Sequence, residues 1–223
     1  MGNDSAKRFD PTEPAERMLV VGLAGQPNVG KSTLFNLLTG LSQHVGNWPG
    51  KTVDRREGVF LREGTRLRII DLPGTYSLTA NSEEARIARD FIIHSQPDVV
   101  VMIADASALE RNLYLLTELL ALPVPVVLGL NMMDVAEAEG IRIEPHVLEA
   151  ALGLPVIPLV ATQNQGVAEL VGMAERLARE PGGYRPNRPQ IAERHRDVLA
   201  QVRAGLNKHL SKGLDRPQAA RGR

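Results

Sequence analysis

The sequence predicts an α/β domain whose central sheet is mostly parallel and is covered by helices on both faces. Two observations lead to this fold class. Short apolar runs of strand length alternate with longer segments that carry apolar residues at helical spacing, and strands joined by helices form parallel sheets. A glycine-rich segment, GQPNVGKS at residues 25–32, also stands where a first strand should turn into a first helix.

The first half of the predicted domain begins with a strand that leads into a helix. Residues 18–24 read MLVVGLA and are apolar throughout, which is typical of a strand buried on both faces. Two further strands, 59–61 and 67–70, are expected to pair around a turn at Glu63 and Gly64. The helix at 31–40 is expected to turn inward Leu34, Phe35, Leu37 and Leu38.

The second half continues the alternation of strands and helices. Residues 82–95 predict a helix that Ser82 caps, because its hydroxyl can accept a hydrogen bond from a free backbone N–H. The acidic Glu83 and Glu84 suit the first turn of this helix. We expect the remaining strands at 99–104, 124–130 and 156–160, and the remaining helices at 109–122, 145–152 and 167–179.

The composition is that of an ordinary globular protein. Of the 223 residues 43% are hydrophobic, and 26 Lys and Arg balance 26 Asp and Glu. This balance argues against a nucleic-acid-binding domain, which usually carries a basic excess. The absence of Cys excludes disulfides, thiolate metal sites and Cys nucleophiles. We expect a soluble, intracellular chain, because the sequence has neither the ~20 consecutive apolar residues that span a bilayer nor a signal peptide.

Charge and Pro/Gly content divide the chain into five parts. Residues 181–223 carry 10 Lys and Arg against 3 Asp and Glu. The Pro- and Gly-rich stretch that opens this region indicates a linker, and apolar residues at helical spacing follow it. The helix they predict either packs on the domain or docks on a partner or on anionic lipid. The expected parts are a flexible arm at 1–17, the α/β domain at 18–180, a linker at 181–189, an amphipathic helix at 190–211 and a flexible tail at 212–223.

The segment GQPNVGKS matches the phosphate-binding pattern G-x-x-x-x-G-K-[ST] in full. Gly25 and Gly30 let the backbone curl so that its N–H groups point at phosphate oxygens, and the following helix adds its positive end. Lys31 reaches the β- and γ-phosphates, and Ser32 offers its hydroxyl to Mg²⁺. The expected nucleotide-binding residues of this loop are Gly25, Gln26, Pro27, Asn28, Val29, Gly30, Lys31, Ser32 and Thr33.

Two further polar segments end predicted strands at the same edge of the sheet. Asp71, in the D-x-x-G segment 71–74, can hold Mg²⁺ through water, and the Gly74 N–H can bind the γ-phosphate. Asp134, in the N-x-x-D segment 131–134, can accept hydrogen bonds from guanine N1–H and N2–H₂, a donor pair that adenine lacks. A polar loop in which Asp134 only caps a helix stays an alternative, and with it an adenine-specific ATPase.

The order of these motifs resembles that of small GTPases of the translation-factor type. The sequences of these motifs are similar to those of the cytosolic G domain of the bacterial ferrous iron transport protein B (FeoB) family. The similar segments are GQPNVGKSTLFNLLTG, VGNWPGKTV, DLPGTYSL, NMMD and VIPLVATQNQG. The most specific piece is residues 45–53, since few other GTPases place Asn-Trp-Pro-Gly before the switch threonine. The resemblance covers residues 18–180 and implies a Ras-like P-loop GTPase fold with three layers, followed by a short helical appendage.

The resemblance also implies roles in metal binding and catalysis. Thr52 is the switch I threonine, which meets Mg²⁺ and the γ-phosphate when GTP is bound. Asn28 helps to coordinate K⁺ beside the phosphates, and backbone carbonyls near Asn47 and Trp48 complete the shell. The cation then offsets developing charge where an arginine finger otherwise would; an Asn28 that only caps the loop backbone is the alternative. The implied catalytic residues are Asn28, Lys31, Thr52 and Gly74, and the implied Mg²⁺ residues are Ser32, Thr52 and Asp71.

Three further expectations concern the base and the switches. The Ala161 N–H is expected to face guanine O6. Trp48, the only Trp, stands in a loop rich in Gly, Asn and Pro, and is expected to be exposed in a mobile switch. Thr75 stands where Ras-like proteins have the Gln that orients the attacking water, and it is too short for that role. The implied base-side residues are Asn131, Met132, Asp134, Val160, Ala161 and Thr162.

Together these observations predict a slow, Mg²⁺-dependent and K⁺-stimulated GTPase domain that regulates ferrous iron uptake. Its expected ligands are GTP and GDP, and its expected partner is a membrane-embedded ferrous iron channel portion, in cis or in trans. The resemblance places it in the cytoplasm, at the cytosolic face of an inner-membrane transporter. No nucleic acid is expected, and a homo-oligomer stays open. The alternative is a stand-alone GTPase resembling Era or MnmE that acts on the ribosome or RNA, which only the basic tail supports.

Overall fold

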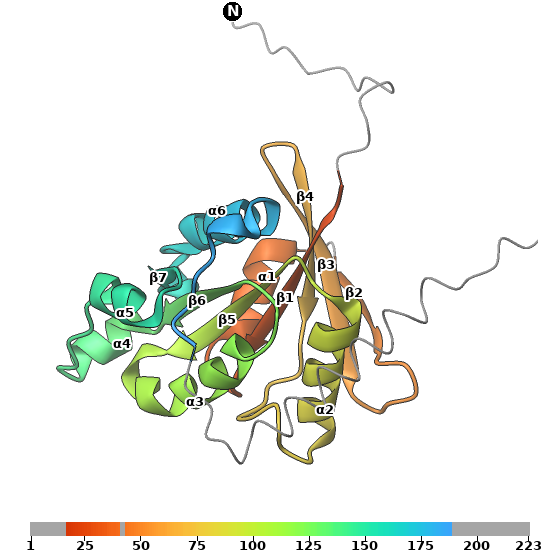
Figure 1. Ribbon diagram of the computed structural model, residues 1–223, viewed down its shortest axis with the longest axis horizontal. Coiled ribbons are helices and arrows are strands. Elements are labelled where there is room, and N and C mark those ends of the chain that lie inside the picture. The colour runs from red at the N-terminus through yellow and green to blue at the C-terminus, as the bar shows by residue number, and fades with distance from the viewer. Residues whose placement is uncertain (1–16, 41–42, 189–223) are drawn as a thin grey trace, which may run out of the picture.

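The computed structural model of the chain describes residues 17–40 and 43–188, and in this part the strands form one seven-stranded sheet (Figure 1). The strands are β1 (Leu19–Gly25), β2 (Gln43–Asn47), β3 (Asp54–Arg62), β4 (Thr65–Asp71), β5 (Val99–Asp105), β6 (Val126–Asn131) and β7 (Val156–Pro158). Their order in the sheet is β2-β3-β4-β1-β5-β6-β7. The five strands from β4 to β7 are parallel, whereas β2 and β3 form an antiparallel edge.

Helices cover both faces of the sheet, so the predicted three-layer α/β fold is confirmed (Figure 1). The helices are α1 (Lys31–Thr39), α2 (Glu83–Asp90), α3 (Leu109–Leu120), α4 (Met133–Ala138), α5 (Pro145–Leu152) and α6 (Val167–Arg179). α1 and α6 pack on one face, and α2 to α5 pack on the other. Short 3₁₀ turns stand at Ala106–Ala108, Ala161–Gln163 and Pro181–Gly183.

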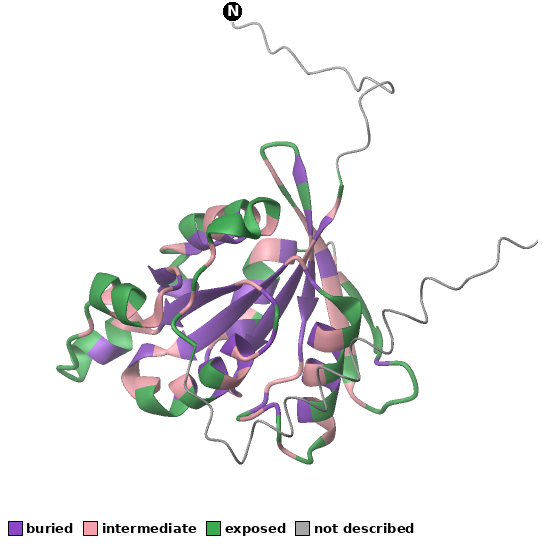
Figure 2. Ribbon diagram, viewed as in Figure 1, coloured by how far each residue is buried: buried purple, intermediate pink, exposed green. Residues whose placement is uncertain are grey.

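The apolar core lies on the two faces of the central strands, which Figure 2 shows as buried. A strand sends successive side chains to opposite faces. In β5, Val99, Val101 and Ile103 pack in the layer of α1 and α6, whereas Val100 and Met102 pack in the layer of α2 and α3. Because β5 is buried on both faces, its sequence is continuously apolar, which is the pattern that predicts a central parallel strand.

Most predicted boundaries agree with the structure to within a few residues. β3 and β4 pair around the expected turn, and Ser82 caps α2 by accepting the Ala85 N–H at 3.1 Å. The predicted helix 82–95 is α-helical only to Asp90 and ends in a π-helical turn at Phe91–Ser95. Helix α5 and helix α6 begin and end at the predicted residues.

The sequence analysis missed two elements, β2 and α4. β2 reads QHVGN and is mostly exposed, so it lacks the apolar alternation that marks a strand. It exists through its pairing with β3. α4 has six residues and forms between the predicted strand at 124–130 and the predicted helix at 145–152, where no element was expected, because a helix this short leaves no periodic signal.

The ends of the chain fall partly outside the described residues. Of the predicted arm at 1–17 only Arg17 is described, and it forms an ion pair with Asp98 at 2.6 Å. The predicted helix at 190–211 and tail at 212–223 lie outside the described residues. Within residues 17–40 and 43–188, no helix is both long and apolar enough to cross a bilayer.

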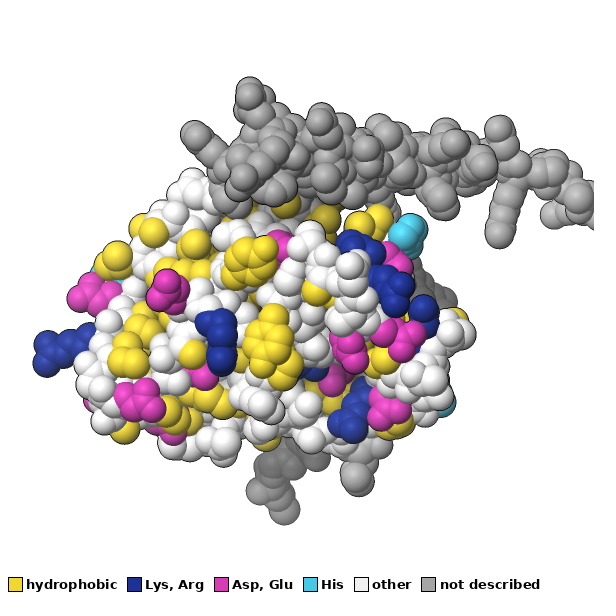
Figure 3. Space-filling view, turned by 90° about the horizontal axis from the view of Figure 1, so that it is seen from below, with side chains coloured by type: hydrophobic (Ala, Val, Ile, Leu, Met, Phe, Trp, Pro, Cys, Tyr) yellow, Lys and Arg dark blue, Asp and Glu magenta, His cyan; other side chains and the backbone are white. Residues whose placement is uncertain are grey.

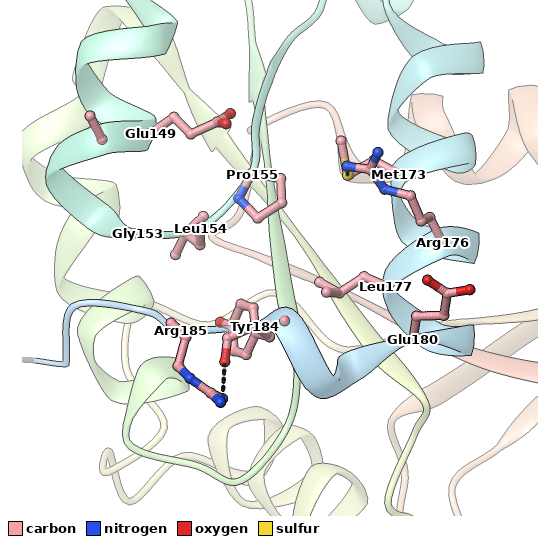
Figure 4. Close-up of a pocket in the computed structure, with 12 residues that line it drawn as sticks. Glu149, Gly153, Leu154, Pro155, Met173, Arg176, Leu177, Glu180, Tyr184 and Arg185 are labelled. Atoms are coloured by element: carbon pink, nitrogen blue, oxygen red, sulfur yellow. Dashed lines mark hydrogen bonds between the residues drawn. The ribbon is translucent and has the colours of Figure 1, made fainter.

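The described part of the predicted linker 181–189 lies against the α/β domain. The Asn187 N–H donates to the Leu152 carbonyl at 2.8 Å, and the Asn187 side-chain amide donates to the Ala151 carbonyl at 2.9 Å. The Tyr184 ring packs against the apolar core, and burial raises the pKa of its hydroxyl to about 12. Figure 4 shows that Tyr184 borders a pocket of about 620 Å³ between α5 and α6.

Candidate nucleotide-binding site

The segments predicted to bind nucleotide meet at the carboxyl ends of the parallel strands. The phosphate loop follows β1, the D-x-x-G segment begins at the end of β4, and the N-x-x-D segment begins at the end of β6. In open α/β sheets, ligands bind at this edge. Figure 3 looks onto this end of the molecule, where acidic and basic side chains lie among apolar ones and neither charge dominates.

The phosphate loop runs from Gly25, the last residue of β1, to Gly30, which precedes α1. Gly30 (φ 86°) and Asn28 (φ 66°) both adopt left-handed backbone, which turns neighbouring N–H groups toward one side. A Cβ at Gly30 would lie 2.2 Å from the Asn131 amide nitrogen, and one at Gly25 would lie 2.7 Å from the Ile103 carbonyl oxygen. Close packing therefore requires glycine at both positions.

Two side chains of the loop point into the protein. Gln26 is buried, and its amide donates to the Arg111 carbonyl at the start of α3, at 2.7 Å. Val29 is buried in the core. These two residues can therefore contact a nucleotide only through their backbone, whereas the Asn28 side chain is exposed.

Lys31, the first residue of α1, forms an ion pair with Asp71, the last residue of β4. Each side chain is 10% exposed or less, so each charge depends on the other for compensation. The pair forms because β4 lies beside β1, with Leu23 opposite Asp71. The structure thus brings together the loop lysine and the D-x-x-G acid, which the sequence placed at one edge.

The oxygen donors beside this pair suit Mg²⁺. Asp71 supplies a carboxylate, and Ser32 supplies a hydroxyl at the exposed start of α1. Mg²⁺ prefers hard oxygen ligands and binds through one or two carboxylates, water and phosphate. Among the described residues no cluster of His, Cys, Asp and Glu could hold a metal ion by itself. The Asp71 and Ser32 oxygens therefore fit an ion whose other ligands come from a phosphate and water.

The D-x-x-G segment folds back onto the phosphate loop. A Cβ at Gly74 would lie 3.3 Å from the Pro27 nitrogen, and the Thr75 N–H donates to the Gly25 carbonyl at 3.2 Å. The Thr75 side chain is buried, and its hydroxyl donates to the Ser77 carbonyl at 2.8 Å. This bond directs the hydroxyl toward residue 77 of its own loop.

Glu118 on α3, which the sequence analysis missed, holds the loop that follows. Its carboxylate accepts hydrogen bonds from the Ser77 hydroxyl at 2.9 Å, the Leu78 N–H at 2.5 Å and the Thr79 hydroxyl at 2.8 Å. From α2, the Arg89 guanidinium donates to the Leu78 carbonyl at 3.2 Å. No sequence pattern marks Glu118, because a single acid on an amphipathic helix is more often solvated.

On the base side, the buried Asn131 amide joins two loops. Its Nδ2 donates to the Val29 carbonyl at 2.9 Å, and its Oδ1 accepts the Ala161 N–H at 3.0 Å. The phosphate loop and the loop at 160–162 are thereby fixed relative to each other. Asn131 holds the Ala161 N–H in this structure, so the expected contact of this N–H with guanine O6 would require it to leave or share this acceptor.

Asp134 lies in the first turn of α4, after Met132 turns the chain with φ 61°. Asp134 lines a pocket of about 600 Å³ together with Val160 and Gln163. The exposed Thr162 lies within the same 3₁₀ turn as Gln163. The acid of the N-x-x-D segment and the loop after β7 therefore border one space.

Trp48 is buried, so the prediction that it is exposed is wrong. Only 8% of the residue is exposed. Its ring meets the edge of Phe91 at a centroid distance of 5.7 Å and an angle of 72°. The Arg55 guanidinium lies 5.0 Å from the Trp48 ring centroid. The ring thus anchors residues 45–53, the predicted switch I segment, to the π-helical turn after α2.

The other switch I residues also lie along α2 and the sheet edge. The Thr52 hydroxyl donates to Glu83 at 3.4 Å, and the Lys51 ammonium lies 3.4 Å from the same carboxylate. Asn47 pairs with Asp54 in the edge ladder. The structure therefore brings Lys31 and Asp71 together but directs Thr52 to Glu83, and it places Asn47 on the outermost strand.

Comparison with known sequences identifies the family of this chain. The family model described as ferrous iron transport protein B matches residues 19–174. The Fe(2+) transporter FeoB of Shigella flexneri is 49% identical over 158 residues, which are 69% of this chain and 20% of the transporter. The FeoB of Salmonella typhi is 44% identical over 185 residues, 74% of this chain and 24% of that protein. The chain thus spans about a fifth of the length of these curated relatives.

Solved structures agree with the sequence comparison. The G domain of the T. maritima FeoB iron transporter has a TM-score of 0.69 and 42% identity, and the match covers 73% of this chain and 99% of that one. The FeoB G domain of Methanococcus jannaschii has a TM-score of 0.65 and 45% identity, with 73% and 99% covered. An S. thermophilus NFeoB mutant bound to GDP has a TM-score of 0.73 and 39% identity, with 82% and 70% covered. This chain therefore belongs to the ferrous iron transport protein B family and carries its N-terminal G domain.

Proposed function

We propose that this chain binds GTP and GDP and hydrolyses GTP to GDP and phosphate. The observation that carries the proposal is the Asn131 amide, which joins the phosphate loop at Val29 to the loop at Ala161. The same amide thus fixes the phosphate loop relative to the loop that borders the Asp134 pocket. The GDP bound to the S. thermophilus relative supports the choice of nucleotide.

Asp134 and Thr162 together select guanine. The carboxylate accepts N1–H and N2–H₂, whereas adenine offers no such donor pair. Since the Ala161 N–H is held by Asn131, we assign guanine O6 to the next N–H in the 3₁₀ turn, that of Thr162. Adenine carries an amino group at that position, so its donor would meet another donor. The site thus discriminates against adenine at two points.

Lys31 and Asp71 exchange partners when the nucleotide binds. Lys31 turns to the β- and γ-phosphates, and Asp71 and Ser32 would hold Mg²⁺, which when bound neutralises phosphate charge. The exchange keeps both buried charges compensated, which limits its cost. The N-terminal end of α1 adds its positive dipole, and the Gly74 N–H faces the γ-phosphate from beside Pro27.

GTP draws switch I away from α2. Thr52 must leave Glu83 to meet the γ-phosphate and the metal, and the contacts to be broken are long and partly exposed. Surface ion pairs contribute only about 0–1 kcal/mol, so the larger cost is the removal of the buried Trp48 ring from Phe91, and the differential contacts that the γ-phosphate offers must exceed it. GDP lacks the γ-phosphate and leaves switch I on α2.

We assign K⁺ stimulation to the side-chain carbonyl oxygen of Asn28. Asn28 is exposed on the phosphate loop, where an oxygen ligand can hold a monovalent cation beside the β- and γ-phosphates. The backbone carbonyls of Asn47 and Trp48 complete the shell only after β2 leaves the sheet edge. K⁺ binding and switch I closure are therefore coupled in this proposal.

The activity serves ferrous iron uptake. The Fe(2+) transporters to which the chain is similar are about five times its matched length, and we propose that the G domain regulates a membrane-embedded ferrous iron channel portion, in cis or in trans, from the cytosolic side. Membership of this family does not support the alternative of an Era- or MnmE-like GTPase that acts on RNA.

The test is phosphate release from Mg·GTP in K⁺ and in Na⁺ at equal ionic strength, for the wild-type chain and Asn28→Ala. We expect faster release in K⁺, and we expect Asn28→Ala to remove the difference. Release from ATP serves as the comparison and should stay at background. Equal rates in both salts would overturn the K⁺ assignment, and no release from GTP in either salt would overturn the GTPase assignment.

A further inference from the structure

The loop after the D-x-x-G segment is held from α3 by one carboxylate. Glu118 is half-buried, and within the described residues its three donors all come from Ser77, Leu78 and Thr79. The Ser77 and Thr79 hydroxyls also lie 2.9 Å apart. A carboxylate has two oxygens with about four acceptor positions, so it can bind all three donors at once.

The same loop is bonded to the phosphate loop at its other end. Thr75 donates its N–H to the Gly25 carbonyl at 3.2 Å and its hydroxyl to the Ser77 carbonyl at 2.8 Å. The Ser77 N–H in turn approaches the Thr75 hydroxyl oxygen at 3.3 Å. Gly74 directly precedes Thr75 and packs on Pro27. A continuous chain of hydrogen bonds therefore runs from Glu118 to the residue beside Gly74.

We propose that Glu118 is a positioning residue for the γ-phosphate, which rests on the proposed GTPase function. Its carboxylate fixes residues 75–79, and this loop in turn fixes the direction of the Gly74 N–H. An N–H aimed at developing charge is effective only if it is already oriented. Glu118 acts on the reaction through Gly74 and does not touch the nucleotide.

The proposal predicts different effects on the binding of GTP and of GDP. The Gly74 N–H meets only the γ-phosphate, so loosening its loop weakens the binding of GTP and leaves GDP almost unaffected. Glu118→Leu keeps the size of the side chain and removes its acceptors. We expect kcat to fall about tenfold, which is less than the roughly 10²–10³-fold loss on complete removal of a transition-state donor, because the Gly74 N–H is loosened and not removed. We expect the affinity for the analogue GMPPNP to fall about fivefold, while the affinity for GDP stays within about twofold.

Glu118→Gln should restore most of the activity. The Gln carbonyl can accept the Leu78 N–H, and its amide can donate to the hydroxyl oxygens of Ser77 and Thr79. The matched control is Glu110→Leu, because Glu110 is exposed on the first turn of the same helix. This control should leave kcat and both affinities unchanged. Thr79→Val removes one donor from an exposed position and reports on the same contact if Glu118→Leu does not fold.

The experiment measures steady-state GTP hydrolysis and the binding of GMPPNP and GDP by the full chain with Mg²⁺ and K⁺. A selective loss for GMPPNP, with recovery in Glu118→Gln, supports the proposal. Equal losses for GMPPNP and GDP, or an unchanged kcat in a folded Glu118→Leu or Thr79→Val variant, overturn it. If the wild type hydrolyses no GTP, the proposed function fails. The ratio of GMPPNP to GDP affinity then still decides whether Glu118 positions the loop.

Discussion

Asn131 and Val29 are hydrogen-bonded at 2.9 Å although 102 residues separate them. The same amide accepts the Ala161 N–H, so one side chain holds the phosphate loop and the base-side loop together. Asn131→Ala leaves a buried carbonyl and a buried N–H without this partner. We expect a loss of about 2–6 kcal/mol in the free energy of unfolding, at about 1–3 kcal/mol for each unsatisfied group.

The same variant should bind GDP at least tenfold more weakly, since the two loops no longer share one position. Urea unfolding without nucleotide and calorimetric titration with GDP measure the two effects. Asn81→Ala, at an exposed position before α2, is the control and should change neither. Normal GDP affinity in a destabilised Asn131→Ala would show that the amide serves stability alone.

Asp134→Asn should change the base that the site prefers. The amide presents an N–H₂ where the carboxylate accepted, so guanine N1–H meets a donor, while xanthine offers an oxygen at C2. We expect GTP affinity to fall by about 10²-fold or more, in line with sites that lose a paired hydrogen bond, and XTP affinity to rise above it. Competition binding with GTP, XTP and ATP measures the change. Glu139→Gln, exposed at the end of the same helix and outside the Asp134 pocket, should keep the preference for GTP, and an Asp134→Asn that also keeps it would place the base elsewhere.

Glu175 makes the stability of the domain depend on acid pH. The hydrogen bond from Thr65 holds the pKa of Glu175 below 4.5 against the opposing effect of burial, and bonds from Arg62 and Arg179 add to it. Because the folded-state pKa lies below the unfolded one, the stabilisation is fully present above pH 4.5 and is lost as pH falls through the folded pKa.

Glu175→Gln should therefore be about 1–2 kcal/mol less stable than the wild type at pH 7, as for one charge-assisted bond. The difference should shrink below pH 4.5. Urea unfolding between pH 3 and pH 7 measures it. Glu169→Gln, exposed on the same helix, should show no such trend. A difference that stays constant with pH would assign the loss to packing instead of charge.

The sequence predicts those parts of the site whose chemistry is local. The glycines of the phosphate loop and the Lys that follows occupy a fixed register between a strand and a helix, so their spacing alone specifies the curled loop. The pairing of Lys31 with Asp71 also follows, because neighbouring parallel strands end at one edge. These features depend on residues close in sequence or on strand adjacency, which the alternation of apolar runs encodes.

Features that depend on distant packing were not predictable. The composition of the loop around Trp48 indicates exposure, yet Phe91 lies more than forty residues away and covers the ring. Glu118 has the pattern of any solvated acid on a helix until α3 is placed beside residues 77–79. In both cases the partner lies in another element, and local sequence carries no information about it.

The burial of Trp48 gives the change in its fluorescence a defined direction. A ring packed on Phe91 emits at short wavelength, and it should do so without nucleotide and with GDP. GMPPNP draws Thr52 from Glu83, and because Thr52 lies four residues after Trp48, the ring should leave Phe91 and its emission should shift to longer wavelength. Titration with GMPPNP and GDP, with Trp48 as the only Trp, measures this without a label.

Trp48→Phe is the blank. Thr52→Ala should abolish the shift, because it removes the hydroxyl that the γ-phosphate and the metal recruit. An identical spectrum with GMPPNP and GDP would mean that switch I stays on α2 in both states, and the coupling of K⁺ binding to its closure would have to be abandoned.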